Sequence, residues 1–302
     1  MTDKNSFDII IIGGSYTGLS AAMALGRSLR RVLIIDSGNP CNAQTPHSHN
    51  LITHDGATPK EIAEEARLQV LKYNTVKFYS GLVTEGVRVD NGFEITTESG
   101  ESFNSKKLLF ATGVKDLFPD IKGIAACWGI SVLHCPYCHG YEVKHKNLGL
   151  LANGDVAFEL CKLISNWSKQ LTLFTNGKST LTTEQIQKLK SHDIDIVEKE
   201  ILFLDHLNGY INEIVFTDNS KEKVDAIFTR LAFKQHCEIP ENLGCEFTEQ
   251  GYTKVDDFYR TTIGGVYAAG DNTIMGRSVA LAIAAGNKAG AFINKDLIEE
   301  RF

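Results

Sequence analysis

The sequence predicts an α/β fold with two domains of alternating strands and helices, the second inserted into the first. A βαβ pattern opens the chain, because apolar runs at 7–12 and 32–35 flank an alanine- and leucine-rich segment at 19–29. A second βαβ pattern begins near Leu148, with apolar runs at 148–152 and 171–175 around a helix-like segment. A strand at 266–269 then leads to an Ala- and Gly-rich helix at 278–293, so the first domain resumes after the second.

Shorter signals predict the remaining elements. The segment from Pro59 to about Tyr73 favours a helix, and residues 107–111 favour another buried strand. Alternating apolar residues and tight-turn sequences predict strands at 76–79, 86–89, 93–97, 193–198 and 226–229, with hairpin turns at Asp90-Asn91-Gly92 and Asn208-Gly209.

Composition excludes two classes of partner. The 302 residues carry a formal net charge of −6 and a pI near 5.9, which argues against nucleic-acid binding. No stretch approaches the roughly 20 apolar residues of a membrane span, and the apolar start at 7–12 lacks a basic leader and a cleavage site. We therefore expect a cytoplasmic protein with no nucleic acid and no membrane among its partners. There the seven cysteines would be reduced or catalytic thiols and not a disulfide scaffold.

A glycine-rich turn follows the first strand. Gly13, Gly14, Ser15 and Gly18 stand where a dinucleotide-binding fold needs a tight turn and close approach of the backbone to a pyrophosphate. Ser15 occupies the place of the usual middle glycine. Asp36 ends the next strand, about 20 residues on, where a carboxylate can hold ribose hydroxyls. A tight turn without a ligand is the alternative, but the flanking strand and helix together with Asp36 favour nucleotide binding.

Two further segments resemble FAD-binding sequences of the flavoprotein disulfide reductases. Ala111, Thr112 and Gly113 match their Ala-Thr-Gly segment, where the chain leaves the FAD domain. The strand that ends in Gly270 and Asp271 matches their second FAD fingerprint, whose carboxylate holds the ribityl chain of the flavin. The resemblance implies that FAD is the cofactor.

Cys135 and Cys138 form a Cys-Pro-Tyr-Cys motif. Thiol–disulfide exchange needs a thiolate, and such a pair can close a small disulfide and lower the pKa of one thiol. Half of a zinc site and a pair of buried structural cysteines are the alternatives, although no second Cys-x-x-Cys follows to complete a zinc site. Together with the FAD segments, the motif favours redox use.

Taken together, the motifs resemble the low-molecular-weight thioredoxin reductases over essentially the whole chain. The resemblance implies a homodimer with two Rossmann-like domains. Residues 1–116 and 240–302 would bind FAD, and an inserted NAD(P)-binding-like domain at 117–239 would carry the redox pair.

The match to the family's Cys-Ala-Thr-Cys-Asp motif implies a role for each residue of the redox pair. Cys138 would face the flavin, and Cys135 would exchange with substrate. His139 stands where the family has its acidic proton-transfer residue, and an imidazole with an ordinary pKa of about 6.5 suits that role. The string from Cys135 to Glu142 is more similar to the branch that contains fungal and bacterial dithiol oxidases.

The inserted domain departs from the family pattern where NADPH would bind. The family's Gly-Gly-Gly-Asp-Ser-Ala loop is Ala-Asn-Gly-Asp-Val-Ala at 152–157, so the first turn glycine is Ala152. The family's His-Arg-Arg is Thr-Asn-Gly at 175–177, and Lys178 alone does not reproduce a bidentate guanidinium grip on a phosphate. We therefore expect weak or no use of NADPH.

Other polar residues lie near the expected flavin site. Arg277 and Ser278 open the last helix, whose N-terminal dipole is expected to stabilise negative charge on a reduced flavin. His47, His49 and His54 follow the Asp36 strand, where a polar loop beside the flavin is expected in preference to a metal site. We predict no metal site.

The sequence thus predicts an FAD-dependent thiol–disulfide oxidoreductase. Its substrate would be a dithiol or disulfide, either a small molecule or a thioredoxin-like protein. The enzyme could be an oxidase that passes electrons from a dithiol to dioxygen. The alternatives are an NAD(P)H-dependent thioredoxin-disulfide reductase, a reductase with a ferredoxin-type donor, and a non-enzymatic flavin- or zinc-binding protein.

Overall fold

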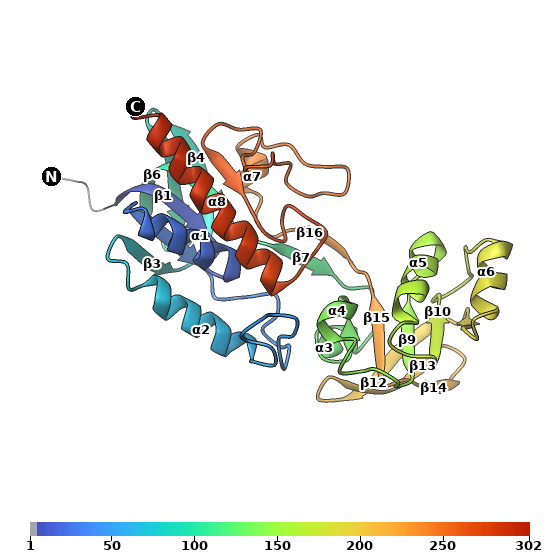
Figure 1. Ribbon diagram of the computed structural model, residues 1–302. Helices are drawn as coiled ribbons and strands as arrows, with labels where there is room; N and C mark the ends of the chain where they lie inside the picture. Colours follow the sequence, from blue (N-terminus) through green and yellow to red (C-terminus); the bar gives the residue numbers. More distant parts are fainter. Residues whose placement is uncertain (1–4) are drawn as a thin grey trace. The chain divides into compact units, whose positions relative to one another are not determined.

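The computed structural model describes residues 5–302, and the chain forms two compact units (Figure 1). Unit 1 comprises the residues up to Ala43 together with 57–115 and 233–302, and unit 2 comprises 44–56 and 116–232. The predicted α/β fold is confirmed. The sequence analysis expected the domain boundaries at 116/117 and 239/240, and it did not set residues 44–56 apart.

Unit 1 is built on a seven-stranded sheet of order β3-β2-β1-β6-β5-β4, in which β17 also pairs with β6. Strands β1, β2, β3, β6 and β17 are parallel, whereas β5 and β4 add antiparallel strands next to β6. The strands are β1 (Ser6–Ile12), β2 (Val32–Asp36), β3 (Val76–Ser80), β4 (Val83–Val89), β5 (Gly92–Thr97), β6 (Ser102–Phe110) and β17 (Val266–Ala268). The helices are α1 (Tyr16–Arg27), α2 (Pro59–Val70), α7 (Ile239–Asn242) and α8 (Val279–Glu299).

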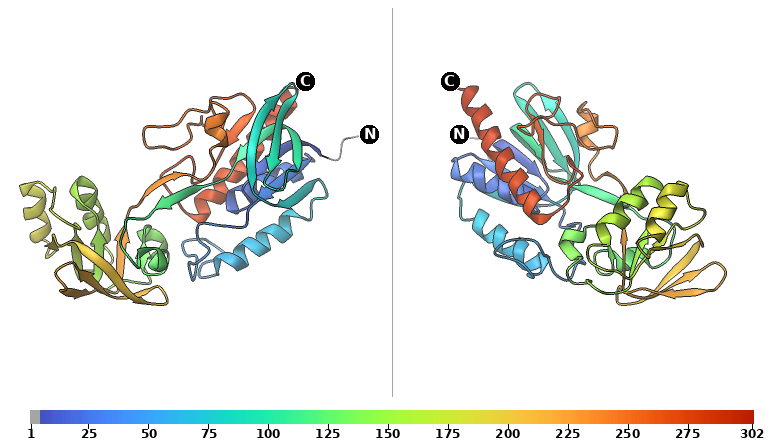
Figure 2. Two further views of the ribbon diagram at one scale, coloured as in Figure 1. Left: turned by 180° about the vertical axis from the view of Figure 1, so that it is seen from behind. Right: turned by 45° about the vertical axis from the view of Figure 1, so that its right-hand side comes forward.

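The isoleucine run of β1 is buried on both faces of this sheet. Ile9 and Ile11 belong to one apolar cluster with residues of α1 and α8. Ile10 and Ile12 belong to a second cluster on the other face, with Phe93 of β5. Because both faces are covered, the strand is continuously apolar instead of alternating. In the view from behind, β4 and β5 lie in front of α8 (Figure 2).

Unit 2 contains a five-stranded parallel sheet of order β11-β10-β9-β15-β8. In both units the first strand of the βαβ motif, β1 or β9, lies between the second strand of that motif and a strand from later in the chain. A separate three-stranded antiparallel sheet, β12-β13-β14, belongs to the same unit. The strands are β8 (Val132–Leu133), β9 (Leu148–Leu151), β10 (Leu171–Phe174), β11 (Asp195–Val197), β12 (Ile201–Leu207), β13 (Tyr210–Phe216), β14 (Lys221–Lys223) and β15 (Ala226–Thr229). The helices are α3 (Ile124–Cys127), α4 (Pro136–His139), α5 (Gly154–Ile164) and α6 (Thr183–Lys190).

The chain passes between the units four times, after Ala43, Gly56, Lys115 and Ala232, and the last two passages lie in short strands. These are β7 (Val114–Leu117) and β16 (Ala232–Gln235), which pair with each other as a two-stranded sheet. The sequence analysis predicted neither strand. Both contain charged residues and lack the apolar alternation that marks a half-buried strand.

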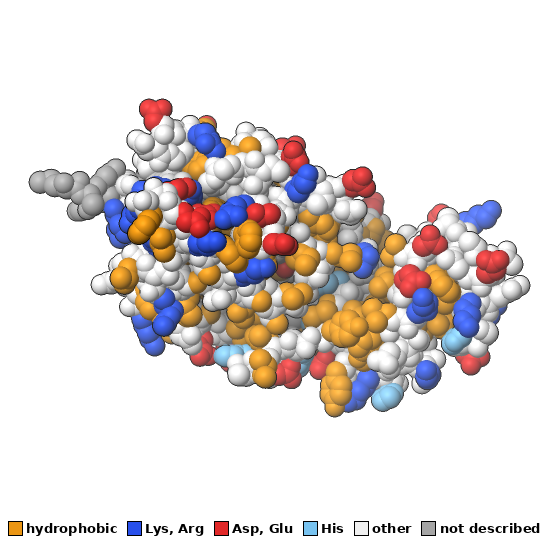
Figure 3. All heavy atoms as spheres, turned by 45° about the horizontal axis from the view of Figure 1, so that its top comes forward, with side chains coloured by type: hydrophobic (Ala, Val, Ile, Leu, Met, Phe, Trp, Pro, Cys, Tyr) orange, Lys and Arg blue, Asp and Glu red, His pale blue; other side chains and the backbone are white. Residues whose placement is uncertain are grey.

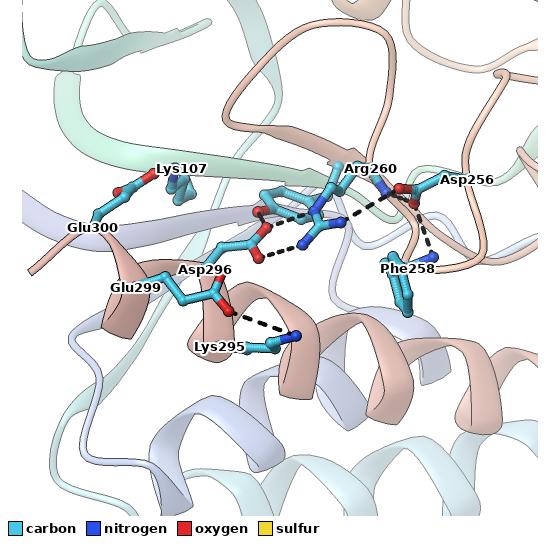
Figure 4. Close-up of polar contacts among 9 residues, drawn as sticks. Lys107, Asp256, Phe258, Arg260, Lys295, Asp296, Glu299 and Glu300 are labelled. Atoms are coloured by element: carbon cyan, nitrogen blue, oxygen red, sulfur yellow. Dashed lines mark hydrogen bonds and ion pairs between the residues drawn. The ribbon is translucent and has the colours of Figure 1, made fainter. Parts of the chain in front are cut away.

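A group of charged side chains fastens the C-terminal end of α8 to the rest of unit 1 (Figure 4). The Asp296 carboxylate accepts a hydrogen bond from Arg260 Nε at 2.8 Å and another from the hydroxyl of the buried Tyr267. Lys107 of β6 forms an ion pair with Glu300 just beyond the helix. These residues also line a cavity of about 410 Å³.

The surface carries charges of both signs, as expected from a sequence with 31 basic and 37 acidic residues. Basic and acidic side chains are interspersed over the face drawn in Figure 3. Among residues 5–302, no helix combines the length and the apolar character needed to cross a membrane.

Candidate active site

The first candidate site lies in unit 1, where a glycine turn joins β1 to α1. Gly13 has φ +103°, and a Cβ atom there would lie 2.3 Å from the Ala111 carbonyl oxygen. A Cβ atom on Gly18 would lie 1.9 Å from the Gly13 carbonyl oxygen. Real Cβ atoms do not approach so closely, so the turn, the end of β6 and the start of α1 require glycine at both positions.

The N-terminus of α1 suits an anion. Ser15 is the N-cap residue, but its side chain makes no capping hydrogen bond, and the first turn contains no acidic residue. The partial positive charge of the helix start is therefore not neutralised by a neighbouring side chain of that turn. Asp36, at the end of β2, accepts hydrogen bonds from the backbone N–H of Gly14 and, at 2.6 Å, from that of Gly38.

The other predicted FAD segments converge on the same turn. A Cβ atom on Gly270 would lie 2.5 Å from Thr17 Oγ1 of α1, so the turn after β17 lies against the first turn of α1. Asp271 forms a 3.3 Å ion pair with Arg277 Nε. Ser278 caps α8 by accepting a hydrogen bond from the backbone N–H of Leu281 at 3.2 Å.

The segment after β6 completes this group. Ala111 is buried and forms the wall against which Gly13 packs. Thr112 follows it, and Gly113 has φ +64°, a conformation that favours glycine. The unit 1 site residues that the sequence predicted thus lie around the start of α1, on the strand ends beside it, or, for Arg277 and Ser278, at the start of α8.

These residues fit an FAD. The glycines leave backbone surface that any Cβ would fill, the uncapped start of α1 offers N–H groups to a pyrophosphate, and Asp36 offers a carboxylate to a ribose. Asp271 is half-buried, directly follows the Gly270 turn that packs against Thr17 of α1, and offers a carboxylate to a ribityl chain. When bound, FAD supplies the two-electron acceptor.

The second candidate site lies in unit 2, where Cys135 and Cys138 form a disulfide with a Cα–Cα distance of 5.3 Å. Cys135 is the N-cap of α4, and its Sγ accepts a hydrogen bond from the backbone N–H of Cys138 at 3.2 Å. Pro136 stands at the first helical position, where its missing N–H costs nothing. After reduction, the N–H of Cys138 favours the thiolate form of Cys135.

His139 ends α4 directly after the disulfide. Burial lowers the pKa of its imidazole below the ordinary value of 6.5; the Glu142 carboxylate opposes this shift and His49 adds to it. A neutral imidazole beside a thiol pair is ready to accept a proton.

The His49 contact was missed by the sequence analysis. Residues 44–56 fold with unit 2, and His49 Nε2 lies 3.6 Å from Glu142 Oε1 while its Nδ1 lies 3.7 Å from Asp55 Oδ1. His47 instead contacts the Gly56 carbonyl oxygen through Nδ1 at 2.9 Å. His49 and Glu142 lie 93 positions apart in the sequence, so no local sequence signal predicts their contact.

His54 makes a different contact: its Nδ1 lies 2.9 Å from the hydroxyl of Thr53. Within residues 5–302, no three His, Cys, Asp or Glu side chains converge to hold a metal ion.

In the loop of unit 2 where the family binds a nucleotide, the side chain of Asn153 hydrogen-bonds backbone groups at the start of α5 and in the segment after β10. Asn153 Oδ1 accepts hydrogen bonds from the backbone N–H of Gly154 (2.8 Å) and of Thr180 (2.9 Å). Its Nδ2 donates to the Lys178 carbonyl oxygen at 2.9 Å. Asp155 adds a negative charge in the first turn of α5. This helix start therefore differs from that of α1, which has neither a side-chain cap nor an acid.

Comparison with known proteins agrees with this architecture. A family model described as pyridine nucleotide-disulphide oxidoreductase matches residues 7–289. Thioredoxin reductase tcpT of Claviceps purpurea is 32% identical over 311 residues, covering 99% of this chain and 97% of that protein. Thioredoxin reductase sirT of Leptosphaeria maculans is 31% identical over 311 residues, covering 97% of this chain and 95% of that protein.

A solved structure shows the same likeness over the whole chain. The crystal structure of a putative thioredoxin reductase TrxB from Bacillus anthracis superposes with a TM-score of 0.94 at 33% identity, covering 98% of this chain and 100% of that one. The two Rossmann-like domains expected from the sequence are those of this fold. The chain therefore belongs to the pyridine nucleotide-disulphide oxidoreductases, as a thioredoxin reductase-like enzyme of a family that uses FAD.

Proposed function

We propose that this protein is an FAD-dependent dithiol oxidase that uses NADPH weakly or not at all. The net reaction converts a dithiol and dioxygen into a disulfide and hydrogen peroxide, so two electrons and two protons leave the substrate. FAD, held by the glycine turn, Asp36 and Asp271, supplies the acceptor between the thiols and dioxygen.

The thiol chemistry is assigned to Cys135 and Cys138. A substrate thiolate attacks Cys135 Sγ, the Cys135–Cys138 bond breaks, and Cys138 leaves with the electron pair. The second substrate thiol then attacks the first substrate sulfur, and Cys135 leaves as a thiolate. His139 accepts a proton from a substrate thiol, since its lowered pKa keeps the imidazole neutral near pH 7.

The observation that carries the proposal is the filled nucleotide loop of unit 2. A dinucleotide pyrophosphate needs the free N–H groups of a helix start. At α5 the Asn153 side chain takes the N–H of Gly154 and bridges to Thr180. Binding of NADPH here requires that these Asn153 contacts break.

The segment after β10 supports the same conclusion. Thr175 Oγ1 donates to the Gly177 carbonyl oxygen at 2.6 Å, and Asn176 Oδ1 accepts from the N–H of Ile201 at 2.7 Å. These side chains hold the backbone and offer no cation to a 2′-phosphate. Loss of two charge-assisted hydrogen bonds, at about 1.5–3 kcal/mol each, weakens binding by roughly two to four decades.

The test is an anaerobic titration of the oxidised holoenzyme with NADPH, NADH and dithiothreitol, followed by flavin absorbance. We expect dithiothreitol to bleach the flavin and both nucleotides to leave it oxidised at equal concentration. Peroxide should then appear when air is admitted. Rapid stoichiometric bleaching by NADPH would overturn the proposal.

A second candidate is an NAD(P)H-dependent thioredoxin-disulfide reductase, which is favoured by the names of the relatives tcpT and sirT. Bleaching by NADPH followed by reduction of a thioredoxin would identify it. Bleaching by neither donor would point to a ferredoxin-type donor. The cytoplasmic location and the homodimer stay predictions, and light scattering of the holoenzyme tests the homodimer.

A further inference from the structure

His49 lies between two carboxylates in unit 2. Its Nε2 is 3.6 Å from Glu142 Oε1, and its Nδ1 is 3.7 Å from Asp55 Oδ1. Each ring nitrogen therefore faces its own acid. An imidazole in this setting can take a proton on one nitrogen and release a proton from the other.

The loop that carries His49 is held in place by its own hydrogen bonds. The N–H of Gly56 donates to the Ser48 carbonyl oxygen at 2.9 Å, and the N–H of Asn50 donates to Asp55 Oδ1 at 2.7 Å. Gln44 donates from Nε2 to the carbonyl oxygen of Ala125 at 3.2 Å. These contacts close residues 48–56 into a ring and fix the loop to α3, so the position of His49 does not depend on a mobile segment.

Glu142 links His49 to the redox pair. It follows His139 by three residues, and its carboxylate and the His49 ring are the two groups that act electrostatically on His139. The His47 ring centroid lies 6.3 Å from that of His49 and contacts no carboxylate of this group. The groups around His49 are therefore Glu142, Asp55, His139 and the more distant His47.

The exposed fractions of these side chains show that a proton on His49 can reach solvent through the neighbouring carboxylates. Asp55 is 66% exposed and Glu142 is 38% exposed, whereas His49 between them is 21% exposed. A proton on His49 thus has solvent-facing carboxylates on both sides. The distances exceed a hydrogen bond by about 0.5 Å, which a rotation of either exposed carboxylate or one bridging water closes.

The proton balance of dithiol oxidation calls for a second acceptor. Forming a disulfide from two substrate thiols releases two protons while the Cys135–Cys138 bond takes up two electrons. A single imidazole holds one of these protons. When bound, FAD would accept the electron pair together with one proton, so the other proton must leave for the solvent.

We propose that His49 is the second proton acceptor of this reaction, coupled to His139 through Glu142 and discharged to solvent past Asp55. The inference rests on the proposed function, because dithiol oxidation sets the number and direction of the protons. His49 acts through His139 and touches no reacting sulfur, so it is a positioning residue in the proton path.

The experiment is anaerobic stopped-flow reduction of the holoenzyme flavin by dithiothreitol between about pH 6 and about pH 9. His49→Gln should slow reduction about tenfold near pH 7, below the effect of removing a direct general base. Added imidazole should restore the rate of His49→Ala. Glu142→Gln should slow reduction to a similar degree, and the double variant should be no slower than either single variant, since both residues serve one path.

His47→Gln is the matched control, because His47 is exposed, lies two residues away and faces neither acid. It should keep the wild-type rate and pH profile. If His49→Gln does not retain FAD, the same reduction rates are measured for Glu142→Gln and Asp55→Asn instead. Failure of dithiothreitol to reduce the wild type would defeat the proposed function. Wild-type reduction with unchanged rates and pH profiles in all three variants would overturn the role of His49 alone.

Discussion

The nucleotide turn of unit 1 depends on residues that have no side chain. Gly18 lies inside α1, in an ordinary helical conformation, so the reason for glycine there is space and not backbone strain. A Cβ atom would meet the Gly13 carbonyl oxygen at 1.9 Å. The close approach of helix and strand brings the N-terminus of α1 to the pyrophosphate position.

Gly18→Val should therefore push α1 away from the turn and weaken FAD binding by at least about tenfold, since overpacking of this kind costs about 1–3 kcal/mol. The ratio of flavin to protein absorbance in purified protein measures the effect. Gly264→Ala is the control, because nothing lies within 4 Å of a Cβ atom there. Full FAD occupancy in Gly18→Val would show that the turn does not bind FAD.

The two cysteines should respond differently to substitution. If Cys138 faces the flavin, Cys135→Ser should leave a thiolate that gives a long-wavelength charge-transfer band. Cys138→Ser should lose that band and leave Cys135 open to alkylation, aided by the N–H of residue 138 that stabilises the Cys135 thiolate. Absorbance spectra and iodoacetamide labelling measure both. The opposite pattern would exchange the two roles.

The lowered pKa of His139 has a consequence for stability. Below the ordinary value of 6.5, the unfolded chain binds a proton at this imidazole more readily than the folded chain. This contribution to stability is thus present above about pH 6.5 and is lost as the pH falls. Urea unfolding between about pH 6.5 and about pH 5 should show a shallower pH dependence for His139→Gln than for the wild type. Identical slopes would show that burial does not shift this group.

Residue identities were predictable where the chemistry lies in one short segment. Gly13, Gly18 and Asp271 could be located because the strand, turn and helix signals around them are local. The contact of His49 with Glu142 and the bridge from Asn153 to Thr180 could not be predicted. Each depends on how distant loops fold against each other, which no spacing encodes.

Among the elements, α8 connects the predicted flavin segments to the far end of unit 1. It begins at Ser278, beside the Asp271–Arg277 ion pair, and runs along α1 (Figure 1). Gly286 allows this approach, because a Cβ atom there would lie 2.1 Å from the Thr17 carbonyl oxygen. The C-terminal end of α8 is fixed by Asp296, which accepts hydrogen bonds from Arg260 and Tyr267.

Asp296→Ala should lower the free energy of unfolding by about 2–3 kcal/mol, because the buried Tyr267 hydroxyl and the Arg260 guanidinium lose their shared acceptor (Figure 4). The loss stays below that of a fully buried pair, since the Arg260 side chain is 36% exposed. Urea unfolding measures it. Glu299→Ala should change stability by less than about 0.5 kcal/mol, because Glu299 contacts only the exposed Lys295 in Figure 4. Equal effects of the two substitutions would rule out this anchoring role.

Helix and strand centres were predicted better than their ends. The strand at 226–229 and both hairpin turns are confirmed. The last helix was predicted over 278–293 but extends to Glu299, where Asp296 and the buried Leu297 hold polar residues in helical form. Strand β6 begins at Ser102 and not at 107, because its polar first half pairs with β5. The ends of these elements depend on contacts with residues distant in the sequence, so a local sequence pattern does not predict them.

In the molecule as a whole, the two units share a strand arrangement but differ at the start of the helix that follows the first strand of each βαβ motif. Strands β1 and β9 occupy equivalent places in their sheets, and α1 and α5 follow them. The first start is bare and the second is capped by Asn153 and carries Asp155. The two helix starts therefore differ in whether a side chain already accepts hydrogen bonds from nearby N–H groups, and the proposed function rests on this difference.

The insertion of unit 2 into unit 1 also sets an order of events during synthesis. Residues 116–232 leave the ribosome before the final segment 233–302, so unit 2 can fold while unit 1 still lacks β17 and α8. The sheet edge beside β6 and the apolar face of α1 stay uncovered until that segment arrives. We therefore expect FAD to bind only after residues 233–302 have been made, and a nascent chain stalled before β17 would hold all of unit 2 without a complete FAD site in unit 1.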